Sequence, residues 1–302
     1  MNVQSIRSDD AYRAMALAPE SKRDDIYRYE LMTPLKKKWD CYHVPVKASR
    51  PGGYDVVMAS DMLGILAPSS VDESLLEKIA LISDDGFWNT CQVAVERSLS
   101  RFAERGIELP VWEYRFTVLL ANPANPSVMA SEGYAGDGGI PGFILVWLDP
   151  NDLTLSRMPA ALAHEANHNV RFQFIEWSND ITLAEMLVSE GLAENFAESL
   201  FGKKNVGPWV TKTSEETLRH AIKPKLREAL GVQGMAALSA YLYGDEIAAL
   251  QGYPTAGLPY CAGYACGYHL VKQFLIETGT DIADATVLPA SDILEATKSF
   301  WD

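Results

Sequence analysis

The sequence predicts an α+β protein in which a small mixed sheet precedes an all-helical C-terminal part. Two apolar runs, at residues 113–120 and 143–148, have the length and composition of buried strands. After Glu176 the apolar residues recur at helical spacing, over segments near 182–201, 214–230, 233–251 and 261–278. Strands and helices that are separated along the chain in this way are typical of the α+β class.

The N-terminal residues 1–41 are predicted to form a helical arm. The segment from Asp9 to about Asp40 is polar, and its apolar residues form only a sparse helical stripe. The lysine run at residues 36–38 is interpreted as a solvated helix face. No motif in the first hundred residues indicates a role in function.

Residues 42–177 are predicted to form an upper α+β lobe that ends in a helix. Residues 44–58 contain two short apolar runs separated by a turn-forming stretch, which predicts a hairpin or two strands. Between the two main strands we expect a short strand at residues 128–130. The glycine-rich residues 133–142 are expected to form a flexible loop.

The helix after the second strand carries the motif HExxH at residues 164–168. Residues four apart share a face of a helix, so His164 and His168 can bind one metal ion while Glu165 reaches a water molecule on it. Zinc fits this set of donors best. The helix is expected to begin near Pro159, because proline is favoured in a first helical turn.

The next helix, residues 182–201, begins with the capping box formed by Thr182 and Glu185 and ends at Gly202. Glu190 and Glu194 interrupt its apolar stripe, and a buried carboxylate is costly unless it is paired or bound to a metal. Glu190 as third ligand completes a His₂Glu site with one open position, and Glu194 would then accept a hydrogen bond from a ligating histidine. The alternative is a salt bridge from these glutamates to a basic residue such as Arg171.

The last long helix presents three tyrosines, Tyr260, Tyr264 and Tyr268, with His269 beside them. A tyrosine stripe is more often part of a core than of an active site. Peptide hydrolysis at zinc nevertheless needs a hydrogen-bond donor for the developing oxyanion. Tyr264 is the first candidate for this donor and His269 is the second.

Composition restricts the possible partners. The net charge of −14 argues against nucleic acid as a partner, because a polyphosphate requires a basic surface. No apolar run is long enough to span a bilayer. The first ten residues lack the basic and apolar regions of a secretion signal, which leads us to expect a cytoplasmic protein. The oligomeric state is not indicated.

Three elements resemble the YjaZ-like predicted zinc-dependent proteases of the gluzincin group. They are the HExxH motif, the segment Ser189 to Glu198 (SEGLAENFAE), and residues 262–269 (AGYACGYH), which are similar to the C-terminal GYxxGY helix of that family. The resemblance implies a zincin-like metalloprotease fold with the active-site helix in the upper lobe. It also implies that His164, His168 and Glu190 bind zinc, that Glu165 is the general base, and that a sheet edge pairs with extended substrate.

These observations predict a zinc metallopeptidase that holds one Zn²⁺ per chain, acts on a peptide or protein substrate, and is an endopeptidase. Residues 178–302 would form the helical lobe with the third ligand. One alternative is an aminopeptidase or small-peptide hydrolase in which Glu194 and Glu198 hold the α-ammonium group of the substrate. Another is a catalytically silent peptide-binding protein of the same fold. A structural zinc site is disfavoured, because such sites normally have four protein ligands.

Overall fold

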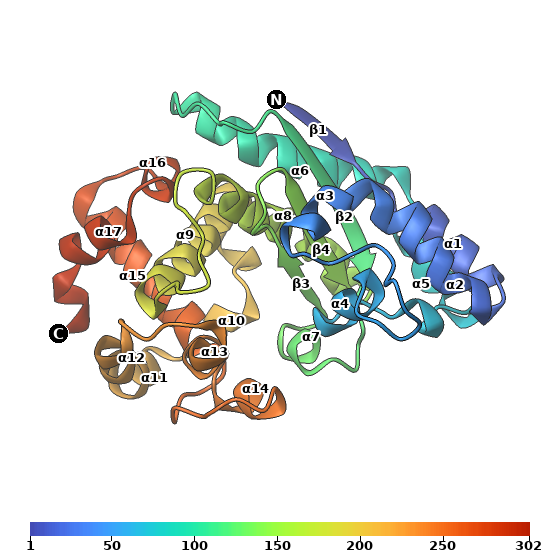
Figure 1. Ribbon diagram of the computed structural model, residues 1–302. Coiled ribbons are helices and arrows are strands. Elements are labelled where there is room, and N and C mark those ends of the chain that lie inside the picture. Colours follow the sequence, from blue (N-terminus) through green and yellow to red (C-terminus); the bar gives the residue numbers. More distant parts are fainter. The chain divides into compact units, whose positions relative to one another are not determined.

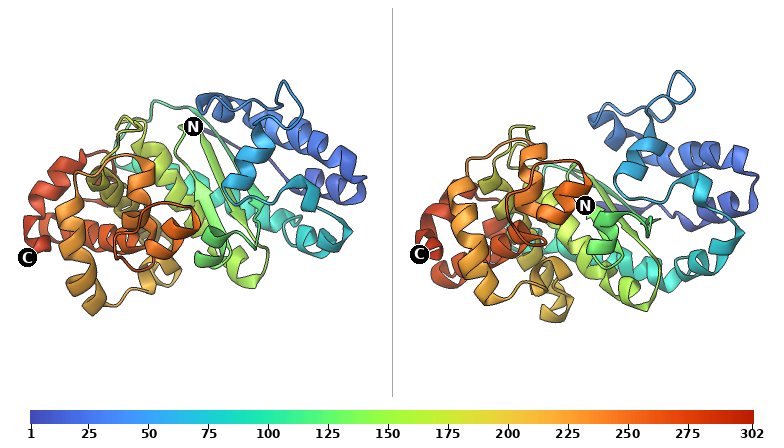
Figure 2. Two further views of the ribbon diagram at one scale, coloured as in Figure 1. Left: turned by 60° about the horizontal axis from the view of Figure 1, so that its bottom comes forward. Right: turned by 90° about the horizontal axis from the view of Figure 1, so that it is seen from below.

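A computed structural model describes residues 1–302, apart from the side chain of Met235. The chain forms two compact units. Unit 1 comprises Met1–Arg97 and Val111–Glu165, and unit 2 comprises Ser98–Pro110 and Ala166–Asp302. All strands lie in the blue-to-green part of the chain, whereas the yellow-to-red part is helical (Figure 1, Figure 2). The predicted α+β class, with a small mixed sheet, is therefore confirmed.

The sheet of unit 1 has four strands in the order β1-β2-β4-β3. The predicted strands β2 (Glu113–Leu120) and β4 (Phe143–Leu148) form its parallel centre, with Thr117 opposite Leu145. Strand β1 (Asn2–Ser5) adds to β2 in parallel, and β3 (Tyr134–Asp137) adds to β4 in antiparallel orientation. The prediction of a loop over residues 133–142 is therefore wrong for its first half, which forms an edge strand.

The strand register assigns side chains to the two faces of this sheet. Gly136 lies opposite Val146, which lies opposite Val118, so Gly136 shares a face with Phe116. We call this face A; the ring of Trp88 packs on it, 6.2 Å from the ring of Phe116. Asp137 lies on the other face, face B, together with Thr117 and Arg115. The guanidinium of Arg115 donates a hydrogen bond to the carbonyl of Pro34 (2.9 Å), so the N-terminal helical segment covers face B.

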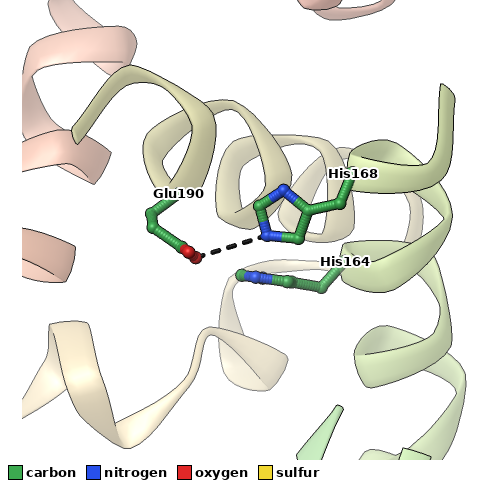
Figure 3. A group of neighbouring side chains, drawn as sticks. All are labelled: His164, His168 and Glu190. Atoms are coloured by element: carbon green, nitrogen blue, oxygen red, sulfur yellow. Dashed lines mark ion pairs between the residues drawn. The ribbon is translucent and has the colours of Figure 1, made fainter. Parts of the chain in front are cut away.

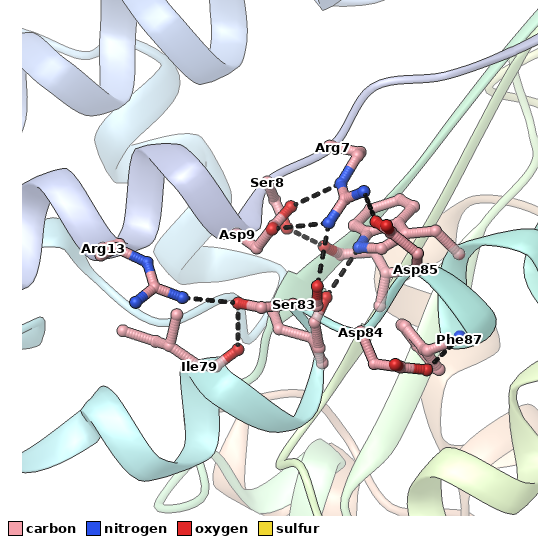
Figure 4. Close-up of polar contacts among 12 residues, drawn as sticks. Arg7, Ser8, Asp9, Arg13, Ile79, Ser83, Asp84, Asp85 and Phe87 are labelled. Carbon is pink, nitrogen blue, oxygen red and sulfur yellow. Dashed lines mark hydrogen bonds and ion pairs between the residues drawn. The ribbon is translucent and has the colours of Figure 1, made fainter.

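Helices form the rest of unit 1. They are α1 (Asp9–Leu17), α2 (Glu20–Ile26), α3 (Lys36–Cys41), α4 (Val56–Met62), α5 (Leu76–Leu81), α6 (Asp85–Glu104), α7 (Pro126–Ala130) and α8 (Asp152–Arg171), with π-helical turns at Tyr27–Met32 and a 3₁₀ turn at Thr33–Leu35. Both α6 and α8 continue into unit 2. Arg7 holds the connection between β1 and α1 in place. Its guanidinium binds Asp9 (2.9 Å), Asp85 and the carbonyl of Ser83 (3.0 Å) (Figure 4).

Two of the predicted strands are helices instead. The prediction of a hairpin over residues 44–58 is wrong, because the side chain of Asp55 accepts a hydrogen bond from the amide of Val57 and starts α4. The prediction of a strand at residues 128–130 is also wrong, because Asn125 caps α7 in the same way, through the amides of Ser127 and Val128. In both cases a side-chain cap decides the local structure.

Helix α8 begins seven residues earlier than predicted. Asn151 accepts hydrogen bonds from the amides of Leu153 (3.0 Å) and Thr154 (3.1 Å), and the hydroxyl of Thr154 accepts one from the amide of Asn151 (3.1 Å). This reciprocal cap starts the helix at Asp152. Pro159 therefore lies inside α8 rather than in its first turn.

Unit 2 is helical, as predicted, and contains no strand among its described residues. Its helices are α9 (Leu183–Phe201), α10 (Pro208–Thr211), α11 (Glu215–Thr217), α12 (Lys223–Ala229), α13 (Met235–Tyr243), α14 (Asp245–Leu250), α15 (Ala262–Thr278), α16 (Ile282–Thr286) and α17 (Ala290–Ala296). The predicted helix at residues 233–251 is divided at Gly244, where φ is 87°. As predicted, Thr182 caps α9 by accepting a hydrogen bond from the amide of Glu185 (3.2 Å).

Helices α9 and α15 cross at two glycines. A Cβ atom on Gly191 would lie 2.1 Å from the carbonyl oxygen of Gly267, and one on Gly267 would lie 2.1 Å from that of Leu187. The side-chain amide of Asn195 links the helices, because it donates to the carbonyls of Gly191 (2.8 Å) and Tyr268 (2.9 Å). The backbones of the two helices are therefore in direct contact at this crossing, with no side chain between them, and this contact fixes how the helices pack.

We expect Gly267→Ala to lower the free energy of unfolding by about 3 kcal/mol, because the new methyl group must push α9 and α15 apart. Urea unfolding monitored by circular dichroism measures this loss. Gly231→Ala is the matched control, since a Cβ atom there meets nothing within 4 Å. Equal stability of the two variants would mean that the helix crossing is not close-packed.

Among the described residues, every helix is too short or too polar to cross a lipid bilayer.

Candidate metal centre

His164 and His168 of α8 and Glu190 of α9 bring three potential metal ligands together (Figure 3). One donor atom from each residue lies within 4.8 Å of the others. The Nε2 atom of His168 is 3.3 Å from Oε2 of Glu190. The three residues are 6–8% exposed, so a ligand between them would be largely shielded from bulk water.

The donor set fits a zinc ion. Ligand atoms at about 2.0 Å from a tetrahedral ion are separated by about 3.3 Å, which is the distance between His168 and Glu190. Two imidazoles and one carboxylate leave a fourth position for water or substrate. The ring of Phe172 stacks against that of His168, with 5.9 Å between the centroids and 11° between the planes, and thus limits rotation of this imidazole.

Glu165 lies next to His164 on α8 and faces the edge strand β3. Its Oε2 atom accepts a hydrogen bond of 2.7 Å from the amide of Gly138. A Cβ atom on Gly136 would lie 2.5 Å from Oε1 of Glu165, and one on Gly138 would lie 2.0 Å from its backbone oxygen. The glycines of the predicted loop therefore make room for this carboxylate on face A.

A cluster of Lys38, Tyr42 and Asp137 lies at the end of the same strand and was not predicted. Lys38 is fully buried, and its Nζ atom is 2.6 Å from Oδ2 of Asp137. The hydroxyl of Tyr42 is 3.3 Å from the same oxygen, and Lys38 Nζ lies 4.9 Å from the centre of the Tyr42 ring. The interpretation of residues 36–38 as a solvated face is thus wrong for Lys38, although Lys36 and Lys37 are exposed.

Charge in this cluster is balanced. Burial alone would raise the pKa of Asp137, but the charge and hydrogen bond of Lys38 outweigh it and hold this pKa below its usual value. Burial raises the pKa of Tyr42, and the charge of Asp137 raises it further. At neutral pH the cluster therefore holds an ionised carboxylate beside a protonated phenol. One feature of the sequence could have indicated that a lysine of the run 36–38 is buried. Three consecutive residues span about 200° of a helix and cannot share one solvated face.

The two glutamates after Glu190 have different surroundings. The carboxylate of Glu194 accepts hydrogen bonds from the amide of Gly207 (2.6 Å) and the indole of Trp209 (2.9 Å). The carboxylate of Glu198 is bound by the ammonium of Lys272 at 2.7 and 2.9 Å and by the hydroxyl of Tyr268 at 2.7 Å.

Arg171 does not form the alternative salt bridge to Glu190 or Glu194. Its fully buried guanidinium donates to the hydroxyl of Ser189 (3.0 Å) and to the carbonyls of Thr286 and Leu288 (both 2.9 Å). It also lies 3.3 Å from the carboxylate of Glu185. Arg171 therefore joins α8 to α9 and to the end of α16.

The candidate oxyanion donors occupy separate places on and before α15. Burial raises the pKa of Tyr264 well above 10, and the charge of nearby Glu190 raises it further, so this phenol is protonated at neutral pH. Tyr268 contacts Glu198 instead, and Tyr260 lies under the ammonium of Lys212, 5.3 Å from its ring centre. Burial, followed by the charge of Lys272, lowers the pKa of His269, so this imidazole is neutral at pH 7.

Comparisons with known proteins agree with these features. The chain is 39% identical over 296 residues to the uncharacterized protein YjfC of Bacillus subtilis (strain 168), with 97% of each chain covered. It is 28% identical over 147 residues to the uncharacterized protein YjaZ of the same organism, covering 48% of this chain and 53% of YjaZ. No solved structure matches. The sequence model of the family described as "Predicted Zn-dependent protease (DUF2268)" matches residues 87–295, and the chain belongs to this family.

Proposed function

We propose that the protein is a zinc-dependent metallopeptidase with a zincin-like fold and that it cleaves internal peptide bonds. The observation that carries this proposal is the convergence of His164, His168 and Glu190, with Glu165 beside them. In this proposal the two histidines and Glu190 hold one zinc ion. Such an ion would polarise the substrate carbonyl and lower the pKa of the attacking water.

Glu165 is the general base in this mechanism. Its carboxylate takes a proton from the attacking water and later passes it to the leaving amine. The hydrogen bond from the amide of Gly138 holds the Oε2 atom of this carboxylate in place. Glu194 is proposed to orient a ligating histidine, and its hydrogen bonds to Gly207 and Trp209 would hold it in place for that role.

The edge strand β3 is the proposed binding site for extended substrate, in agreement with the resemblance to gluzincins. It pairs with β4 on one side only and ends beside Glu165. A peptide that adds to such an edge is held by main-chain hydrogen bonds. This mode of binding requires no free terminus and therefore suits an endopeptidase.

Tyr264 is the proposed donor to the oxyanion. It is protonated at neutral pH and lies within electrostatic range of Glu190. We expect Tyr264→Phe to lower kcat by about 100-fold with little change in metal content. His269→Ala is the comparison variant, and a larger loss of kcat in it than in Tyr264→Phe would transfer the role to His269.

The surroundings of Glu198 favour an endopeptidase over an aminopeptidase. Lys272 already neutralises its carboxylate, at 2.7 and 2.9 Å. A substrate α-ammonium group would have to compete with the ammonium of Lys272 for Glu198.

The experiment that tests the proposal is digestion of an unspecific peptide library by the zinc-loaded protein, analysed by mass spectrometry. Cleavage within N-terminally acetylated peptides is the expected result. Cleavage restricted to peptides with a free N-terminus would indicate the aminopeptidase. Zinc binding without any cleavage would indicate the peptide-binding protein.

A further inference from the structure

Contacts from both faces of the sheet hold the end of the edge strand β3. On face A, the amide of Gly138 donates to the carboxylate of Glu165 (2.7 Å). On face B, the carboxylate of Asp137, the preceding residue, binds Lys38 of α3 (2.6 Å). The short peptide segment between these two contacts thus connects the N-terminal helical segment to Glu165.

We propose that Lys38 is a positioning residue for Glu165, and that it acts through its ion pair with Asp137 and the amide of Gly138. This inference rests on the proposed function, in which Glu165 is the general base. It assigns the N-terminal segment, which lies before the residues matched by the family model, a part in the site.

The ion pair fixes the turn that carries the Gly138 amide. Asp137 accepts a hydrogen bond from the amide of Gly139 through Oδ1 (3.0 Å) and binds Lys38 through Oδ2. Both oxygens are thus used, and the side chain cannot rotate without breaking one contact. Lys38 is fully buried, so its ammonium has no access to solvent as an alternative partner. An ion pair in such surroundings holds its geometry more strictly than an exposed one.

The turn also lies directly on α8. The position of a Cβ atom on Gly138 is 2.0 Å from the backbone oxygen of Glu165, so the two backbones are in contact at this point. A shift of the turn would therefore change the hydrogen bond to the Glu165 carboxylate. Misplacement of a catalytic group by 1 Å can cost about 100-fold in rate.

The test compares Lys38→Met with Lys37→Met, a matched change at an exposed position of the same helix. Three quantities are measured: hydrogen exchange at the Gly138 amide, metal content, and the steady-state constants for peptide cleavage. For Lys38→Met we expect exchange at Gly138 to be at least about tenfold faster. We also expect kcat to be about 10–100-fold lower, with KM within about threefold and metal content unchanged. Lys37→Met should match the wild type in all three.

A double variant separates positioning from stability. Lys38→Met alone leaves the Asp137 carboxylate without a cation to balance its charge. Lys38→Met with Asp137→Asn removes both charges, which should recover thermal stability. The proposal predicts that kcat stays low in this double variant because the turn is still not held. If kcat recovers together with thermal stability in the double variant, the proposal is wrong and the ion pair only stabilises the fold. The double variant also serves if Lys38→Met does not fold.

The exchange measurement keeps this inference separate from the proposed function. If the wild type cleaves no peptide, the proposed function fails, while unchanged exchange at Gly138 in Lys38→Met would by itself refute the positioning by Lys38. Faster exchange with an unchanged kcat would also overturn the proposal, since Glu165 would then not depend on the turn.

Discussion

Glu165→Gln is expected to retain the metal and to lower kcat by about 10²–10⁴-fold, the range typical of a lost general base. Glutamine has the shape of glutamate and still offers an oxygen to the amide of Gly138. It cannot take up the proton of the attacking water. The loss should therefore appear in kcat, while KM and thermal stability change little.

Discontinuous assays with a peptide that the wild type cleaves measure this effect, and the metal content is determined on the same samples. Glu176→Gln, at an exposed position after α8, is the control for the same chemical change. A Glu165→Gln variant with full activity would remove Glu165 from the mechanism.

His168→Ala and Glu190→Ala are each expected to lower zinc affinity by at least about 100-fold and to abolish cleavage. Each substitution would leave two of the three proposed protein ligands, and the distance of 3.3 Å between His168 and Glu190 is compatible with both donors binding one ion. Titration with zinc against a chromophoric chelator measures the affinity. His220→Ala is the control, because this histidine is exposed. Unchanged affinity in either variant would exclude that residue as a ligand.

Local patterns predicted the centre of the sheet but not its edges. The runs that form β2 and β4 are apolar and long enough to be recognised alone, and both strands are confirmed. Strands β1 and β3 have four residues each, and β3 contains a glycine. Only their pairing with β2 and β4 makes them strands, and this pairing depends on residues far away in the sequence.

Helix α9 shows that a pattern with one apolar face does not predict all the buried residues of a helix. Its predicted apolar stripe, which Glu190 and Glu194 interrupt, is buried from Leu183 to Ala197, but Val188, Gly191, Leu192 and Phe196 outside the stripe are buried as well. On one side α15 approaches Gly191 backbone to backbone, and on another the ring of Phe102 stacks on Phe196 at 4.9 Å. A helix surrounded by neighbours has no solvent face from which periodicity can be read.

The sequence predicts the residues of the candidate metal centre better than it predicts the ion pair of Lys38 and Asp137 beside it. His164 and His168 are one turn apart on a single helix, so their convergence is a local property. Glu190 was indicated by the cost of a buried carboxylate. The contact of Lys38 with Asp137 joins residues 99 positions apart, and no local pattern encodes it.

Elemental mass spectrometry of the purified protein tests most directly whether His164, His168 and Glu190 hold one zinc ion. The wild type is exposed to zinc, freed of excess by gel filtration, and compared with His168→Ala and Glu190→Ala treated in parallel. We predict about one zinc per wild-type chain, as for a catalytic site of three protein ligands, and strongly reduced zinc in both variants. A wild-type protein that holds no zinc after this treatment would contradict zinc binding at this site.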